Sequence, residues 1–308
     1  MLQFYRKTTQ IIALLLILIL PILSFYMLVV SGKQQKAFSV ALRENPLPAL
    51  NQLYTFIHKM VDPPHNPEDT APKFDVHKGG IWSLTLFGIN ITDPLGVLGA
   101  FLSSRGFFLV AALGALVPVL FTLLFGRVFC SWVCPVNTLL EWVDSLRGFL
   151  NRLRIPPWDI KIGFNAKYYI LFGTLAMAAG GVSVYSYILP YAILSREVFY
   201  YIFYGTVSVL AFLLLFLAVF ELLLSQRAWC RYLCPEGAFL GIIGAKRLLG
   251  IKRQASLCPE GCVRCGEVCK QGLKPFYEEH YGLECDNCGL CVSKCPSDAL
   301  HFSSKISR

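Results

Sequence analysis

Charged residues are scarce in this sequence of 308 residues: Asp, Glu, Lys and Arg together make up 15% of it, and 55% is hydrophobic. An average soluble domain carries about a quarter charged residues. The net charge is +9, but the chain has no basic stripe interleaved with aromatic side chains of the kind that binds single strands. The composition therefore predicts a membrane protein with a soluble appendix and argues against nucleic acid as a partner.

Histidine and the usual catalytic motifs are also lacking. The chain has five histidines, none of them inside a long apolar run, and no C-x-x-C-H motif. Ordinary haem ligation is thereby excluded. No general acid–base pair, nucleophile triad or phosphate loop is visible, so no catalytic residue is predicted. His58, His65 and His77 lie in a polar segment, where solvated loop residues, metal ligands or contacts to a quinone head group are the alternatives.

Four apolar runs are long enough to span a bilayer, at about residues 11–30, 106–125, 168–189 and 199–224. The first run follows Arg6 and Lys7, so a cleaved signal peptide is the competing interpretation. The run is longer than a usual signal core and no A-x-A site follows it, which favours a retained helix. Residues 31–105 are expected to form a long, proline-rich outer loop with an amphipathic surface helix at 47–61.

The positive charges indicate how the spans are oriented. With four spans, one side of the membrane receives residues 1–10, 126–167 and 226–308, which carry 20 of the 28 Lys and Arg residues, and the other side receives 8. The positive-inside rule makes the first side cytoplasmic. We therefore predict a multi-pass protein of a bacterial cytoplasmic membrane with both termini in the cytoplasm.

Two segments of the chain resemble each other, from Asp93 to Pro135 and from Leu189 to Pro235. Each contains a short segment that ends in Ser-Arg, then a span, then a C-x3-C-P motif. Because two spans separate equivalent positions of the copies, both copies would face the same way and form parallel repeats about an axis along the membrane normal. Arg105 and Arg196 are equivalent in this repeat and are candidate contacts to a quinone oxygen, with lipid contact or interfacial anchoring as the alternative.

The two C-x3-C-P motifs place four thiols at one membrane face. They are candidates for holding a metal ion or a further iron–sulfur cluster, and soft thiolates suit iron, Cu(I) or zinc alike. Four buried, inert thiols are the alternative. Each pair would share one face if its span continues as a helix. Glu221 lies inside an apolar run and is either functional or paired with Arg227. The four candidate ligands are Cys130, Cys134, Cys230 and Cys234.

Eight further cysteines lie in two groups of four near the C-terminus. The second group reads C-x2-C-x2-C-x3-C-P, the run that places thiolates around a [4Fe–4S] cluster and sends its fourth cysteine to a neighbouring cluster. The first group has one residue more in its first gap, and Lys270 stands where proline is usual. We predict two [4Fe–4S] clusters with crossed ligands: Cys258, Cys262, Cys265 and Cys295 for one, and Cys285, Cys288, Cys291 and Cys269 for the other.

Zinc and disulfide bonds are the alternatives for these eight cysteines. Zinc sites usually show paired C-x2-C units separated by a longer loop, which fits three cysteines within seven residues poorly. Disulfides need an oxidising compartment, and the charge distribution places this segment in the cytoplasm.

Taken together, the two C-x3-C-P motifs after spans and the ferredoxin run resemble the NapH/MauN family of polyferredoxin-type membrane proteins. The resemblance extends from about residue 93 to the C-terminal domain. It implies a four-helix membrane protein that takes electrons from quinol and feeds a periplasmic reductase, for nitrate or a related respiratory substrate, through a second ferredoxin-type partner. The long outer loop and the irregular first cysteine group depart from the family pattern. NosR and the cytochrome-oxidase-assembly polyferredoxins are more distantly similar.

The sequence thus predicts a mainly α-helical domain over 1–246, with four transmembrane helices as two parallel repeats, and an α+β ferredoxin domain over 247–308. The expected function is electron transfer as a quinol dehydrogenase-type subunit. Its partners would be lipid, quinol, and a second ferredoxin-type protein or a periplasmic reductase subunit. A metal-handling assembly factor that binds or reduces copper at the four membrane cysteines and a redox sensor are the alternatives.

Overall fold

The structure, a computed structural model, describes residues 1–30, 78–79, 83–86, 89–104, 106, 109–154, 158, 163–182, 184–275 and 282–304. Three sequence predictions fall outside these residues: the surface helix at 47–61, the three loop histidines and Arg105.

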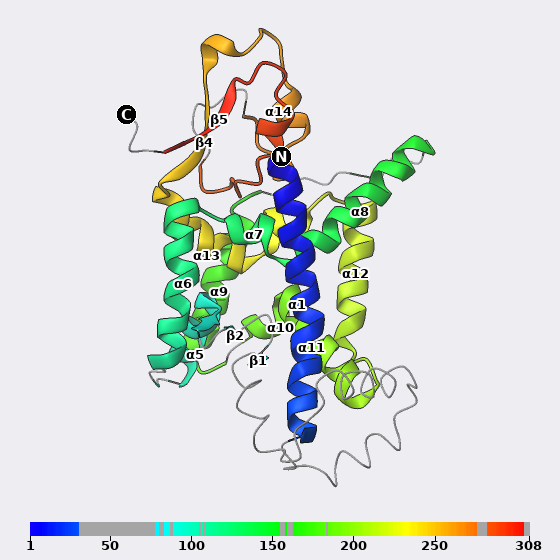
Figure 1. The fold of residues 1–308 in the computed structure, drawn as a ribbon, viewed down its shortest axis with the longest axis vertical. Coiled ribbons are helices and arrows are strands. Elements are labelled where there is room, and N and C mark those ends of the chain that lie inside the picture. Colours follow the sequence, from blue (N-terminus) through cyan, green and yellow to red (C-terminus); the bar gives the residue numbers. More distant parts are fainter. Residues whose placement is uncertain are drawn as a thin grey trace.

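Most of the described chain forms a helical bundle (Figure 1). Helices α1, α6 and α12 run along roughly the same direction in Figure 1, and the C-terminal part sits above one end of them. The bundle consists of α1 (Leu2–Val30), α5 (Pro94–Ser104), α6 (Leu109–Phe125), α7 (Val128–Trp132), α8 (Pro135–Arg152), α9 (Ala166–Ala179), α10 (Tyr185–Ile188), α11 (Pro190–Tyr204), α12 (Leu210–Leu223), the π-helix η1 (Trp229–Leu233), α13 (Pro235–Ile243) and the short 3-10 turn η2 (Gly244–Lys246).

Two of the four predicted spans are interrupted. The run 168–189 is divided between α9 and α10, because α9 ends at Gly180 and Gly181 follows with a positive φ of 91°. The run 199–224 is divided between α11 and α12 by Gly205, whose φ of 66° ends α11. Glycine adopts this left-handed conformation without steric cost. Among the described helices, only α1 is long and apolar enough to cross a membrane by itself, over Leu2–Ile22, while α5, α6 and α12 are apolar but shorter.

The described part of the expected outer loop is packed against the bundle. Strands β1 (Lys78–Gly79), β2 (Ser83–Leu86) and β3 (Ile89–Thr92) form an antiparallel sheet. Strand β3 contacts α6, and α5 contacts both α6 and α9. Residues 89–104 are therefore part of the helical core rather than a free loop, and Leu95 at the start of α5 is 1% exposed.

The beginning of α1 is held by a buried network of charges. Arg6 and Lys7 form ion pairs with Glu141 of α8, and Gln10 donates a hydrogen bond to the same carboxylate. Arg227 approaches Glu141 at 3.9 Å. Arg6 and Gln10 are almost completely buried, so this end of α1 belongs to the protein core.

We expect Glu141 to make the stability of the protein depend on pH. Burial alone would raise its pKa, but hydrogen bonds and charges from Lys7 and Arg6 lower the pKa of Glu141 from 4.5 to about 2. A carboxyl whose pKa is lowered on folding stabilises the protein above its unfolded pKa, and this contribution is lost as the pH falls toward the folded pKa. The Glu141→Gln variant should therefore melt at a lower temperature than the wild type at pH 7, and the difference should shrink below about pH 4.5.

Thermal unfolding in detergent at several pH values measures this difference, and Glu267→Gln, at an exposed position, is the matched control. A gap between wild type and Glu141→Gln that stays constant down to pH 3 would contradict the assignment.

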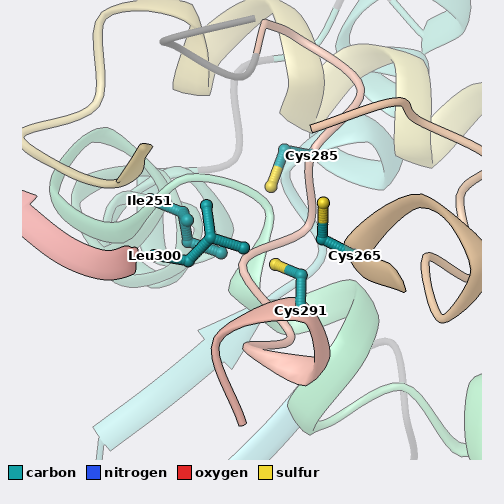
Figure 2. Packing of buried hydrophobic residues seen from close by; sticks show 5 residues of the cluster. All are labelled: Ile251, Cys265, Cys285, Cys291 and Leu300. Atoms are coloured by element: carbon teal, nitrogen blue, oxygen red, sulfur yellow. The ribbon is translucent and has the colours of Figure 1, made fainter. Parts of the chain in front are cut away.

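The C-terminal part is a small α+β unit, as expected. Strand β4 (Leu249–Arg253) pairs antiparallel with β5 (Leu300–Ser304), with Ile251 opposite Phe302. Between the strands the chain forms the 3-10 turn η3 (Ala255–Leu257) and the short helices α14 (Arg264–Glu267) and α15 (Leu290–Ser293). The buried residues of its core are three cysteines and two aliphatic residues. Ile251 and Leu300 pack with Cys265, Cys285 and Cys291, whose sulfur atoms point toward one another (Figure 2).

Candidate iron–sulfur sites

The four cysteines of the C-x3-C-P motifs line one cavity. Cys130 lies in α7 and Cys230 in the π-helix η1, while Cys134 and Cys234 are the residues that cap the N-termini of α8 and α13. The cavity therefore collects thiols from two segments about a hundred positions apart. π-Helices are rare and are frequently found at functional sites.

The condition that each span continues as a helix through its motif is not met. Cys134 has an extended backbone, with φ −60° and ψ 119°, and Cys234 is similar. The following residues, Pro135 and Pro235, stand at the first turn of new helices. Proline is favoured there because the first helical N–H groups have no partner within the helix. Each motif is thus a break between two helices, and this break turns the second cysteine toward the cavity lined by the first.

Two buried arginines lie beside the four thiols. Arg127 and Arg227 each precede the first cysteine of a motif by three residues, and each is 2% exposed. Arg127 donates hydrogen bonds to the carbonyls of Gly237 and Glu284. Arg227 donates to Asp144 at 2.9 Å and to the side chain of Asn137. Both cations offset the negative charge that thiolates would bring into this site.

Burial raises the pKa of all four thiols, that of Cys234 to about 12. Buried thiols with raised pKa values are neutral at pH 7, and a coordinating metal is what deprotonates a thiol. The site thus offers four ligands that become thiolates only when they bind a cationic centre.

The wall of this cavity also carries donors that have no partner. The indole Nε1 of Trp229 and the Nε of Arg127 are both buried and form no hydrogen bond. A buried donor without a partner costs about 1–3 kcal/mol, and sulfur atoms of a cluster accept hydrogen bonds that tune its potential. Within the described part of the chain, no group of three Cys, His, Asp or Glu side chains is arranged to hold a single metal ion. The four thiols and the unpartnered donors around one cavity fit an iron–sulfur cluster.

The cavity also contacts residues that were expected on the opposite side of the membrane. Pro190 and Tyr191, at the start of α11, line it, and the Tyr191 hydroxyl donates to Asp93, the residue before α5. The fold thus brings residues that the sequence assigns to outer segments next to the cysteine cavity, and the membrane topology itself stays a prediction. Helix α11 begins at the cavity, and the hydrogen bond from Tyr191 links its start to Asp93, the residue before α5.

A second cavity is lined by Cys269, Cys285, Cys288 and Cys291. These are the four cysteines of one predicted crossed set, and Cys269 comes from the irregular first group. Cys285 and Cys291 are 8% exposed. Of the other set, Cys258 and Cys262 are half-buried and act electrostatically on Cys265, and Cys295 packs against the same core. Cys265 lies beside Cys285 and Cys291 of the other set (Figure 2).

The segment 284–288, which carries Cys285 and Cys288, is docked on the helical bundle through its backbone carbonyls, and we call it the docking loop. Its carbonyls accept hydrogen bonds from side chains of α1, α7 and the segments that flank α6 and α13. The donors are Arg127 to Glu284, Arg247 to Cys285, Ser131 to Asp286, Trp132 to Asn287 and Gln3 to Cys288. The Glu284 carboxylate in turn pairs with Lys167 and accepts from Tyr168.

Several of these residues were missed in the sequence. The signal for Arg127 and Arg227 was present, because the repeated motif reads R-x2-C-x3-C-P in both copies. The anchors of the docking loop had no such signal, because they come from distant segments. Of the candidate quinone contacts, Arg196 stacks on the ring of Tyr187 at 4.6 Å.

Glu221 and Arg227 do not form the expected ion pair with each other. The Glu221 carboxylate accepts from the backbone N–H of Trp229 at 2.9 Å and thus caps η1, while Arg227 pairs with Asp144. All twelve cysteines are free.

Comparison with known proteins agrees with these sites. Two family models, each described as a 4Fe-4S binding domain, match the chain: one at residues 107–154 and 206–252, which include both C-x3-C-P motifs, and one at 283–301. No solved structure matches.

Three relatives illustrate the similarity. The chain is 29% identical to the ferredoxin-type protein NapH of Haemophilus influenzae, and the match covers 74% of this chain and 83% of that protein. It is 28% identical to NapH of Escherichia coli with the same coverage. It is 30% identical to the methylamine utilization ferredoxin-type protein MauN of Paracoccus denitrificans, over 72% of this chain and 67% of that protein. The more distant resemblance to NosR and the oxidase-assembly polyferredoxins stays a prediction.

Proposed function

Because the chain belongs to the NapH/MauN family of ferredoxin-type proteins, we propose that it is the quinol-oxidising membrane component of an anaerobic respiratory chain. The family and the 4Fe–4S domains establish an iron–sulfur protein of electron transport. The proposal adds the electron donor, a quinol, and the direction of transfer, toward a periplasmic reductase for nitrate or a related substrate.

The observation that carries the proposal is the arrangement of the two cysteine-lined cavities. One lies where the apolar helices α6 and α12 end, and the other lies in the C-terminal unit docked on the same end of the bundle. Cys130 is next to Ser131, which bonds the docking loop, so both cavities belong to one packed structure. A protein that passes electrons between membrane and solution needs such an arrangement.

We propose three iron–sulfur sites. Each cluster, when bound, accepts and releases one electron at a time. The protein's residues would hold the clusters, exclude water and supply hydrogen bonds. The three ligand sets are Cys130, Cys134, Cys230 and Cys234; Cys285, Cys288, Cys291 and Cys269; and Cys258, Cys262, Cys265 and Cys295.

We propose further that the helical part is a multi-pass domain with the C-terminal unit and both termini in the cytoplasm. The ion pairs of Arg6 and Lys7 with the buried Glu141 support a retained first helix, because removing the helix would leave Glu141 without both partners. Interrupted helices are tolerated in membranes where their ends are buried in protein, as the start of α11 is. The parallel repeat stays part of this proposal.

The proposed donor is a quinol, whose oxidation releases two electrons and two protons. Arg196 remains a candidate contact to the quinone oxygen, together with Arg105. The electrons would leave through a protein partner, either a second ferredoxin-type protein or a subunit of the reductase, and lipid surrounds the helices.

Metal analysis and quinol reduction test the proposal together. The full chain, purified anaerobically in detergent, is expected to contain about twelve iron and twelve sulfide per chain when all three sites are filled. Addition of a quinol analogue should produce EPR signals of reduced clusters. Stoichiometric copper without iron at the four membrane cysteines would support the assembly-factor alternative instead. Filled clusters that no quinol reduces, although dithionite does, would overturn the assignment of quinol as donor.

A further inference from the structure

We propose that Gln271 and Asp286 are positioning residues that join the two cysteine-lined cavities. Through them, the cluster held by Cys130, Cys134, Cys230 and Cys234 (the membrane centre) would exchange electrons with the cluster of the Cys285 set (the Cys285 centre). It would not exchange electrons directly with the cluster of the Cys258 set (the Cys258 centre). This inference rests on the proposed function and adds an order to its three sites. It also gives roles to two side chains that no motif singles out.

Gln271 is the residue that the two cavities share. It lines the cavity of the four membrane cysteines and also the cavity of Cys269 and Cys285. It is 5% exposed, and its amide nitrogen donates to the Asp286 carboxylate at 2.9 Å. Its amide oxygen is buried without a partner, so this side chain occupies the wall between the cavities at an energetic cost.

Asp286 connects the same two sites through its backbone. Its carbonyl accepts a hydrogen bond of 2.7 Å from the hydroxyl of Ser131. Ser131 directly follows Cys130, and Asp286 directly follows Cys285. The hydrogen bond between Ser131 and Asp286 therefore links the direct chain neighbours of Cys130 and Cys285.

The Asp286 carboxylate is also placed to act on both cavities. It is 4% exposed and lines the cavity of Cys269 and Cys285, while the hydrogen bond from Ser131 holds the same residue beside the segment that carries Cys130. In a buried site such charges are poorly screened. A negative charge near a cluster disfavours the reduced, more negative state and lowers its potential.

The Cys258 set lies away from this junction. Cys258 and Cys262 are half-buried, and Leu257 and Val263 beside them are exposed by 49% and 45%. The bundle's Arg231 donates a hydrogen bond to the carbonyl of Lys270, which lies outside residues 258–267. This set thus forms the outer end of the three sites.

The test is an EPR-monitored redox titration of the full chain, with dithionite as reductant so that no quinol is needed. The Asp286→Asn variant should raise the midpoint potentials of the membrane centre and of the Cys285 centre, and leave the Cys258 centre unchanged. The matched control is Asp298→Asn, an exposed acid three residues after Cys295, which should shift neither of the first two. A shift confined to one centre, or an equal shift in all three, would overturn the inference.

A second, milder pair of variants tests the contact itself. Gln271→Leu removes the hydrogen bond to the Asp286 carboxylate, and Ser131→Ala removes the hydroxyl that donates to the Asp286 and Val128 carbonyls; neither removes a charge. After flash photoreduction, electron exchange between the membrane centre and the Cys285 centre should slow by at least about tenfold, since small misplacements of reacting groups have effects of this size, with the cluster content unchanged. Exchange at the wild-type rate in both variants would contradict the proposed junction. Because neither readout uses quinol, a failure of this inference can be distinguished from a failure of the proposed electron donor.

Discussion

Replacing Cys134 and Cys234 together by serine is expected to remove about one third of the protein-bound iron and sulfide and to leave the rest in place. Both residues are the N-cap residues of helices at the cavity of the four C-x3-C-P cysteines. A [4Fe–4S] cluster is held by four cysteine thiolates, and a serine hydroxyl is a poor substitute for a thiolate. The serine hydroxyl retains the ability to cap α8 and α13, so the helices should persist. Iron and sulfide analysis and the EPR spectrum of the dithionite-reduced protein measure the loss.

The reciprocal variant is Cys258→Ser with Cys262→Ser. It should remove a different third of the iron and a different EPR signal, because these cysteines belong to the C-terminal unit. If the Cys134/Cys234 variant keeps the full iron content, the membrane cysteines do not hold a cluster. If it loses all iron, the serines have disrupted the fold rather than one site.

Replacing Arg127 by leucine is expected to lower the free energy of unfolding by about 3–5 kcal/mol, the size found when one partner of a buried ion pair is removed. Arg127 holds the carbonyls of Gly237 and Glu284 and lies 3.6 Å from the Glu284 carboxylate. Without it these acceptors stay buried and the docking loop loses an anchor. The variant should therefore melt at a lower temperature, and protease should cleave the C-terminal unit from the bundle more readily.

Two variants make the Arg127 result specific. Arg127→Lys retains the charge but lacks the planar fork that reaches two carbonyls, so it should recover only part of the stability. Arg196→Leu removes an arginine that is half-buried and stacked on Tyr187, a contact worth about 0.5–1 kcal/mol. An equal loss of stability in Arg196→Leu and Arg127→Leu would show that the docking contacts of Arg127 are not responsible.

The nature of the iron–sulfur sites was predictable because the motifs are local. The spacing C-x2-C-x2-C-x3-C-P brings thiols together within one short stretch, whatever surrounds it, and the family prediction drawn from these motifs is confirmed. The cavity lined by Cys269 with Cys285, Cys288 and Cys291 corresponds to one predicted crossed set; the ligand sets themselves stay predictions until iron is located.

The helix boundaries were less predictable. Apolar composition cannot distinguish one long helix from two shorter ones, and Gly180, Gly181 and Gly205 decided the interruptions. Pro135 and Pro235 show the same limit: one helix ends shortly before each proline, and the proline itself begins the next helix. Both outcomes are compatible with the same residue, and only packing selects between them.

The sequence by itself determined the chemistry of this protein: apolar helices, twelve thiols in three recognisable patterns, and an excess of positive charge on one set of segments. Only the tertiary structure decided where that chemistry meets. The fold brings Cys130 and Cys230 to one cavity, places Arg127 near the Glu284 carboxylate, and puts Gln271 in the wall of both cavities. The physical reason is that ligand spacing acts over a few residues, whereas these contacts depend on how distant helices pack.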